Sequence, residues 1–300
     1  MTPHPLRDYG LLVILAVIWG GAFSVIKIAV GSLGPFSVAA ARIALAAVIL
    51  YLVARAAGQK MPSLASIGGG RLWGHFLAVG MLGNGIPFTL VSWGEIEVSS
   101  SLAAILIGVM PIFTVALARL TGVETRFGTA RLIGIGIGFG ALILLMGPAV
   151  LGEIGGRTAL AQLAVAGAAA SYAATAVYAK KLSLTVPTLT LAAASMIACA
   201  VVMVPVALII EPPWQQAPTM GALASVVALG IFPTALASII YFRLLVSAGP
   251  TFASMINYLI PAIGATTGIL WLGESIGMNE VAALTLILAA IGLVRRAPSA

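Results

Sequence analysis

Apolar runs divide this sequence into segments that are each long enough to cross a lipid bilayer. About 20 apolar residues in a helix span the roughly 30 Å of hydrocarbon in a membrane. Backbone amides find no water to bond there, so each run is predicted to be a helix. The runs fall at residues 10–30, 36–56, 72–93, 99–119, 129–148, 159–179, 188–210, 219–243, 250–272 and 279–295. The sequence therefore predicts an all-α integral membrane protein with ten transmembrane helices.

Composition supports lipid as the solvent of this chain. Hydrophobic residues make up 61% and charged residues only 8%, against roughly 45–50% and roughly 25% in soluble domains. The single cysteine, Cys199, excludes a disulfide within the chain and a cysteine-based metal cluster. The net charge of +7 comes from basic residues scattered between apolar runs, so a nucleic-acid partner is not expected. No metal and no cofactor are predicted.

The basic residues lie almost entirely on one side of the predicted membrane. With the N-terminus inside and alternating helices, the outer side receives only Lys27 and Arg157, and Arg42 stays within a run. An excess of Lys and Arg marks the cytoplasmic side. The inner side collects Arg7, Arg55, Lys60, Arg71, Arg119, Arg126, Arg131, Lys180, Lys181, Arg243, Arg295 and Arg296. We therefore expect a multi-pass protein of a bacterial inner (plasma) membrane with both termini cytoplasmic.

Two segments half a chain apart share a pattern. Pro111 precedes Glu124 by thirteen residues, and Pro261 precedes Glu274 by the same distance at an offset of 150. Five helices per half is an odd number, so the second half must cross the membrane in the opposite sense. Residues 1–150 and 151–300 are therefore predicted to be two inverted five-helix repeats, which is typical of secondary transporters.

The residues that carry this pattern also resemble a known family. The stretch AVIWGGAFSVIKIAV, Arg42 in the next helix and the two Pro-to-Glu segments resemble the drug/metabolite transporter superfamily of EamA-type ten-helix carriers. Within it, the chain looks most like the bacterial amino-acid exporters of the YddG type, which act on aromatic and other neutral amino acids. The second half differs from the first at two corresponding positions: it has Tyr172 in place of Trp19 and Ser195 in place of Arg42. Export as the direction of transport is implied by this resemblance alone.

Prolines within the runs predict kinks near a shared cavity. A proline inside a helix lacks an amide and frees the carbonyl four residues earlier, which then needs another partner or a ligand. A packing kink is the alternative for any one proline. The expected kinks are at Pro87, Pro111, Pro233 and Pro261.

Aromatic and amide side chains at the same depth indicate where a small amphipathic ligand would bind. Asn84 and Phe88 are one helical turn apart, as are Trp19 and Phe23. The alternative for such polar groups is helix–helix hydrogen bonding, worth roughly 0.6–2 kcal/mol. The candidate lining of a midplane cavity is Trp19, Phe23, Asn84, Phe88, Tyr178, Asn257 and Tyr258.

Arg42 is the one cation predicted well inside a run. It either extends toward the outer surface or faces a watery vestibule, where it would attract a carboxylate. The predicted runs contain no Asp or Glu deep in the membrane, so a carboxylate proton relay has no evident residue.

The leading interpretation is a secondary transporter that exports small neutral metabolites, above all amino acids including aromatic ones, by alternating access. A drug, metabolite or nucleotide-sugar carrier of the same superfamily remains an alternative, as does a channel. An intramembrane enzyme would need a nucleophile with a base or paired acids, and Cys199 with two distant histidines, His4 and His75, supplies neither. The expected partners are a small-molecule substrate and the bilayer.

Overall fold

A computed structural model describes residues 6–65, 68–122, 129–152, 156–182, 186–253 and 255–296. Within these ranges the chain forms helices joined by short connections, and no strand occurs. The first half contains α1 (Leu6–Ala29), α2 (Pro35–Ala56), α3 (Gly69–Gly80), η1 (Met81–Gly85), α4 (Ile86–Glu97), α5 (Ser100–Ile107), α6 (Met110–Leu120) and α7 (Thr129–Gly152). The second half contains α8 (Arg157–Leu182), α9 (Thr188–Ile210), η2 (Pro213–Gln215), α10 (Met220–Leu229), η3 (Gly230–Leu236), α11 (Ala237–Ala253), α12 (Ile256–Leu272) and α13 (Met278–Arg296).

Seven helical stretches in the described residues are long and apolar enough to cross a membrane. Three of them combine shorter elements: Gly69–Glu97 joins α3, η1 and α4, Ser100–Leu120 joins α5 and α6, and Met220–Ala248 covers α10, η3 and most of α11. Shorter apolar helices lie at Leu132–Leu145, Ile256–Leu272 and Met278–Leu293. The prediction of an all-helical membrane protein is confirmed.

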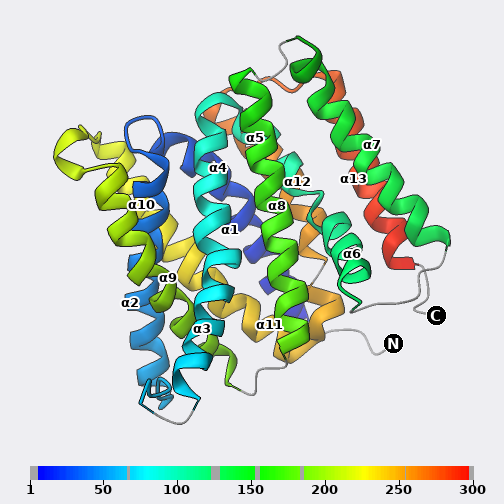
Figure 1. The fold of residues 1–300 in the computed structure, drawn as a ribbon. Helices are drawn as coiled ribbons and strands as arrows, with labels where there is room; N and C mark the ends of the chain where they lie inside the picture. Colours follow the sequence, from blue (N-terminus) through cyan, green and yellow to red (C-terminus); the bar gives the residue numbers. More distant parts are fainter. Residues whose placement is uncertain are drawn as a thin grey trace.

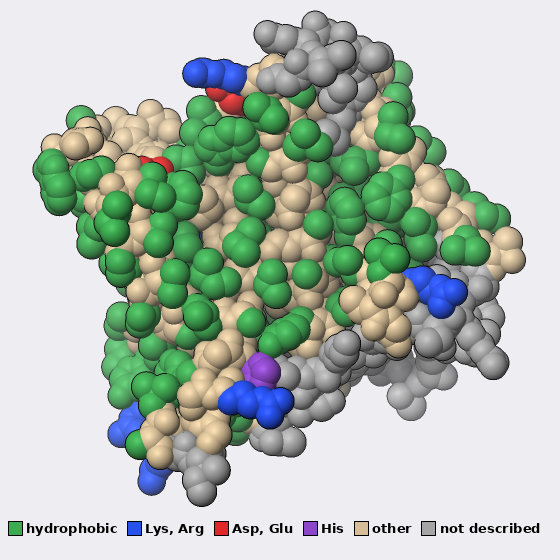
Figure 2. All heavy atoms as spheres, in the orientation of Figure 1, with side chains coloured by type: hydrophobic (Ala, Val, Ile, Leu, Met, Phe, Trp, Pro, Cys, Tyr) green, Lys and Arg blue, Asp and Glu red, His purple; other side chains and the backbone are tan. Residues whose placement is uncertain are grey.

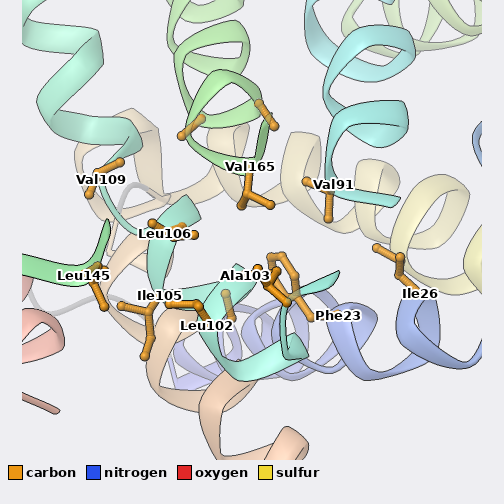
Figure 3. Packing of buried hydrophobic residues seen from close by; sticks show 14 of the residues in the cluster. Phe23, Ile26, Val91, Leu102, Ala103, Ile105, Leu106, Val109, Leu145 and Val165 are labelled. Atoms are coloured by element: carbon orange, nitrogen blue, oxygen red, sulfur yellow. The ribbon is translucent and has the colours of Figure 1, made fainter. Parts of the chain in front are cut away.

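The helices pack as a bundle in which segments far apart in the sequence lie side by side. Helix α2 packs along α9, α1 along α12, and α4 along α8, while α7 and α13 form a pair at one edge (Figure 1). Figure 3 shows Leu102, Ala103, Ile105 and Leu106 of α5 among apolar side chains from the surrounding helices. This buried cluster joins α1, α4, α5, α7, α8 and α13.

Apolar side chains also cover the outside of the bundle. Large residues such as Leu52, Val201, Ile209 and Leu270 are exposed, and Figure 2 shows hydrophobic side chains spread over most of one face. A patch of this extent would aggregate in water, so its solvent is lipid. In the same view the acidic side chains lie toward the upper end, and most of the basic ones lie toward the lower end.

Two helix boundaries differ from the sequence prediction. Helix α4 continues past Trp93 to Glu97, and the break comes at Val98–Ser99, where the Ser99 hydroxyl accepts a hydrogen bond from Leu102 N and caps α5. Helix α11 extends through Gly249-Pro250, where a break was predicted. A proline removes only one backbone hydrogen bond, and this one lies a few residues from the end of α11.

Candidate functional site

Two π-helical segments stand at the prolines of corresponding helices in the two halves. The segment η1 (Met81–Gly85) ends two residues before Pro87, and η3 (Gly230–Leu236) contains Pro233. A π-helical turn loosens the regular backbone ladder and recurs at functional sites. The predicted kinks at Pro87 and Pro233 therefore take this form.

The backbone groups around Pro233 find partners on other residues. The carbonyl of Leu229, four residues before the proline, accepts a hydrogen bond from the Thr234 hydroxyl at 2.7 Å. The Pro233 carbonyl accepts one from Trp19 Nε1 at 2.9 Å. The Trp19 ring also packs on Tyr241, with ring centroids 5.5 Å apart. Trp19 thus connects α1 to the irregular part of η3.

Arg42 lies inside the bundle between the two irregular segments. Its side chain is 3% exposed, so it does not extend to the outer surface. Both Nε and Nη2 donate to the hydroxyl of Thr234, at 3.2 and 3.1 Å. The guanidinium carbon lies 3.8 Å from the ring centroid of Phe88, just beyond η1, in a cation–π arrangement. One hydroxyl receiving two of five N–H donors leaves the guanidinium suited to a carboxylate.

Asn84 and Phe88 differ in burial. Asn84 is half-buried within η1, whereas Phe88 is buried against α2 and α9. The π-helical segment between them changes the local number of residues per turn, which sequence periodicity cannot reveal.

The two proline segments that share the offset of 150 differ in conformation. The helix around Pro111 is broken between Ile107 and Met110, whereas α12 continues through Pro261. The two meet directly: a Cβ atom on Gly108, at the break, would lie 2.8 Å from Pro261 Cγ. Glu124, predicted as the counterpart of Glu274, lies outside the described residues.

The other candidate lining residues are distributed over separate parts of the bundle. Phe23 and Tyr258 belong to the cluster around α5, whereas Trp19 packs with α11 in another cluster. The Tyr178 hydroxyl is hydrogen-bonded to His75 Nδ1 at 2.8 Å, between α8 and α3. Asn257 is half-buried at the start of α12. The structure thus brings Phe88 close to Arg42, and Trp19 to η3, but does not gather all seven residues around one of the cavities described below.

At one end of the bundle, which we call the carboxylate end, Glu274 binds the N-terminus of α5. We call this contact a clasp. Its carboxylate accepts hydrogen bonds from the backbone N–H groups of Ser100 and Ser101, at 2.7 and 2.9 Å, and from both hydroxyls. Burial raises the pKa of the Glu274 carboxyl, but these hydrogen bonds outweigh it and lower the pKa below the ordinary 4.5. Gly268 leaves the space that this contact needs, because a Cβ there would meet the Ser101 hydroxyl and the Glu274 carboxylate. The first turn of a helix favours a carboxylate.

A second clasp at the same end holds α2. The Glu211 carboxylate accepts from the backbone N–H groups of Phe36 and Ser37, at 3.2 and 2.7 Å. Gln216 supports it by accepting from Gly34 N at 3.0 Å and donating to the Ser37 hydroxyl at 2.9 Å. A surface depression of about 520 Å³ beside this clasp is lined by residues of helix ends and loops: Ser32, Gly34, Ile210, Glu211, Pro212, Gln215, Gln216 and Ala217.

The opposite end, which we call the arginine end, has a cavity of about 490 Å³ between α1, α9 and α11. The cavity contains two cations, Arg7 and Arg243, and its wall includes Leu11, which packs in the same cluster as Trp19. One hydrogen bond links α1 and α11 beside it, from the Ser247 hydroxyl to Asp8 Oδ1 at 3.0 Å. The full lining is Arg7, Leu11, Thr188, Leu189, Ile239, Phe242, Arg243, Val246 and Ser247.

Two acidic side chains near helix ends are buried, which the sequence prediction did not include. Glu95 in α4 is 0% exposed, and Asp8 in α1 is 2% exposed. The sequence placed Glu95 after the end of its apolar run, whereas α4 continues to Glu97. Lys27 fixes α1 to this region by donating to the backbone carbonyls of Glu95 and, at 2.8 Å, of Val98.

The described residues hold no group of three or more His, Cys, Asp or Glu that could bind a metal. Sequence reasoning missed Thr234, Glu95 and Glu211. Thr234 alone had a local signal, since a hydroxyl beside a mid-helix proline can replace the missing amide.

Comparison with known proteins places this architecture among transporters. The sequence model of the EamA-like transporter family matches residues 8–147 and again residues 159–296. An uncharacterized inner membrane transporter of Escherichia coli, YedA, is 29% identical over 95% of this chain and 90% of its own length. A probable terminal-alkyne amino-acid exporter of Streptantibioticus cattleyicolor is 27% identical over 88% of this chain and 84% of its own length.

A solved structure confirms the fold independently of sequence. A chain described only as the crystal structure of a protein superposes with a TM-score of 0.67, covering 96% of this chain and 97% of its own length at 17% identity.

Proposed function

The chain belongs to the EamA-like transporter family, and from this premise we propose that it is a secondary transporter that exports small neutral metabolites, with amino acids, aromatic ones included, as its substrate class. The difference between the two ends of the bundle is the observation that supports transport by alternating access. Glu211 and Glu274 bind helix N-termini at one end, where the depression of about 520 Å³ is lined by helix ends and loops. The cavity of about 490 Å³ at the other end lies between the helices α1, α9 and α11. We interpret this as the state that is open to the arginine end.

We propose ten transmembrane helices arranged as two inverted halves, residues 1–150 and 151–300. The two separate matches to the family model support two related halves. Helix α1 begins at the arginine end, where Asp8 bonds Ser247, whereas α8 begins at the carboxylate end, where Arg157 pairs with Glu97 at 3.7 Å. Helices that start from opposite ends support the inversion. In a bacterial inner membrane, the excess of cations assigns the arginine end and both termini to the cytoplasm.

The proposed substrate site is the junction at which Arg42 meets η1 and η3. Arg42 offers unused N–H donors to the carboxylate of an amino acid, in place of the Thr234 hydroxyl. Phe88 and Trp19 offer ring surface to an apolar side chain, which gains roughly 25 cal/mol per Å² on burial. Asn84 in η1 supplies an amide. The other predicted lining residues are proposed to line the route of the substrate through the bundle: Phe23, Tyr178, Asn257 and Tyr258.

Amino acids are proposed because one relative is named a probable amino-acid exporter and because Arg42 suits a carboxylate. A carrier of drugs, nucleotide sugars or other metabolites within the same family is the alternative. The experiment is counterflow: purified protein in liposomes, loaded with one unlabelled metabolite, is screened for uptake of the radiolabelled compound.

Asn84→Ala and Phe88→Ala locate the site in the same assay. Losing one polar contact costs roughly 1–3 kcal/mol, so apparent affinity should fall about five-fold or more. Ser63→Ala, in the loop before α3, is the control. Wild-type affinity in both membrane variants, for every transported amino acid, would place the site elsewhere.

The contact between Gly108 and Pro261 is proposed as the point about which the two halves bend. Replacing Pro261 by alanine supplies an amide and stiffens α12. We expect slower counterflow with unchanged substrate affinity. A variant with normal turnover would assign Pro261 to packing.

A further inference from the structure

Helix α4 carries a carboxylate inside the bundle that the substrate site described above does not use. The Glu95 side chain is 0% exposed, and neither of its carboxylate oxygens has a hydrogen-bond partner among the described residues. Lys27 lies near, but its ammonium donates to the backbone carbonyls of Glu95 and Val98 rather than to the carboxylate.

The surroundings of Glu95 are closely packed. Its neighbour Gly94 packs so closely on α8 that a Cβ there would touch Val165 and lie 3.0 Å from the Ala161 carbonyl. Ser92, one turn earlier on the same face of α4, is also fully buried, and its hydroxyl is unpaired within the described part of the chain. An unpaired carboxylate removed from water is stabilised by binding a proton or a cation. An ionisable residue at such a place in a membrane protein points to function.

Charged and titratable groups lie on the helices packed around Glu95. The charges of Lys27 on α1, Arg42 on α2 and Glu274 after α12 act on Glu95. From α8, Tyr172 interacts with Arg42, Tyr178 is bonded to His75, and Arg157 pairs with the exposed Glu97. Arg42 lies over the ring of Phe88 of α4, seven residues before Glu95, so a positive group and, when ionised, a negative one lie on the packed helices α2 and α4. An amino acid carries the complementary pair of charges.

We propose that Glu95 binds the ammonium group of the substrate, that a proton occupies the same carboxylate when the substrate is absent, and that the protein is therefore an amino-acid/proton antiporter. This inference rests on the proposed transport function. The exchange is balanced: the protonated carboxyl releases its proton to bulk water, and the resulting carboxylate pairs with the ammonium while Arg42 pairs with the substrate carboxylate. Because proton and substrate compete for Glu95, each return to the cytoplasmic side carries a proton inward, which drives export.

Proton release on binding tests this step without transport. Wild-type protein in weakly buffered detergent, mixed with an amino acid that counterflow has identified, should release about one proton per bound substrate. Its apparent affinity should weaken by up to tenfold per pH unit on acidification, the limit for one linked proton. The N-acetyl derivative, which lacks the ammonium, should release none. Binding of the amino acid without proton release would overturn the proposal.

Variants in liposomes test the coupling. Glu95→Gln should retain counterflow at lower affinity but lose the accumulation that a pH gradient drives in the wild type. Glu95→Asp, which keeps a carboxylate, should retain gradient-driven accumulation. Glu97→Gln is the matched control, because this neighbouring glutamate is exposed and pairs with Arg157, and it should behave as wild type. A gradient response in Glu95→Gln equal to the wild type contradicts the proposal, whereas absence of counterflow in the wild type itself would contradict the transport function.

Discussion

At the carboxylate end, two glutamates from the second half of the chain accept hydrogen bonds from the first turns of α2 and α5 in the first half. At the arginine end, a neutral hydroxyl makes a single bond to Asp8, beside a cavity of about 490 Å³. All of these hydrogen bonds go to carboxylates, a class worth roughly 1.5–3 kcal/mol each. The carboxylate end has four at Glu274 and two at Glu211, against the one described at Asp8. One end is thus held by several carboxylate hydrogen bonds to helix N-termini, whereas a single described hydrogen bond links α1 and α11 at the other.

Removing the Glu274 carboxylate should have the largest effect on how firmly the carboxylate end is held. Glu274→Ala leaves the first N–H groups of α5 without their acceptor, so we expect the closed end to open roughly ten-fold more often. The probe is a cysteine in place of Ser24, which is 0% exposed and bonded to Thr267 and Ser100 behind the clasp. Its rate of reaction with a small impermeant thiol reagent should rise in a Cys199→Ala background.

Glu280→Ala controls for charge at the same end, since Glu280 bonds only the nearby Gly277 N in the structure described. An equal rise in the control, or no rise with Glu274→Ala, would mean that the clasp does not close this end.

A methyl group added at Gly268 should also weaken the Glu274 clasp, but less than removal of the carboxylate. Gly268→Ala places a Cβ where the Ser101 hydroxyl and the Glu274 carboxylate now meet, and the flexible carboxylate can keep part of its hydrogen bonding by shifting. We expect about a three-fold to ten-fold faster reaction of the Ser24 cysteine. Gly292→Ala on α13, where a Cβ meets nothing within 4 Å, should leave the rate unchanged.

Acidification should weaken the Glu274 clasp in a defined direction. The pKa of Glu274 is lowered in the folded state, so its contribution is present above the ordinary pKa of 4.5 and is lost as pH falls through the lower folded-state pKa. Labelling of the Ser24 cysteine by a reagent that reacts in acid should therefore stay slow near pH 5 and rise below pH 4.5. In Glu274→Gln this rise should disappear. A rise that begins near neutrality would assign the change to another group.

Removing the hydrogen bond between Ser247 and Asp8 at the arginine end should have the smallest effect on transport. Ser247→Ala removes one hydrogen bond to the Asp8 carboxylate, worth roughly 1.5–3 kcal/mol, at the end that is open in the proposed state. We expect less than a three-fold change in counterflow rate and no change at the Ser24 cysteine. A large loss of transport would show that this contact does more than link two helices.

Much of the fold follows from the sequence because the physics of lipid is simple. Runs of about 20 apolar residues must be helices in hydrocarbon, and the structure has helices in all of these stretches. Arg42 could be singled out because a cation deep in an apolar run is costly. The prolines predicted irregular backbone, but not that Pro87 and Pro233 would sit at π-helical segments.

The contacts between distant residues could not be predicted. Glu211 and Glu274 look like ordinary loop acids, and only the fold brings them to the N-termini of α2 and α5. Glu95 looked like a break between two apolar runs, because local composition does not show that the Ser99 cap delays the end of α4. Packing between helices, rather than periodicity within one, decides which polar groups are buried.

The most direct test of the proposed state, open at the arginine end and closed at the carboxylate end, compares the accessibility of cysteines at the two ends in one membrane. Single cysteines replace Ser24 and Ser247 in a Cys199→Ala background, and inverted and right-side-out vesicles are treated with an impermeant thiol reagent. We expect the Ser247 cysteine, in the cavity wall, to react from the cytoplasmic side in inverted vesicles, and the Ser24 cysteine to be protected in both preparations. Fast reaction of the Ser24 cysteine in right-side-out vesicles, with the Ser247 cysteine protected in inverted ones, would contradict it.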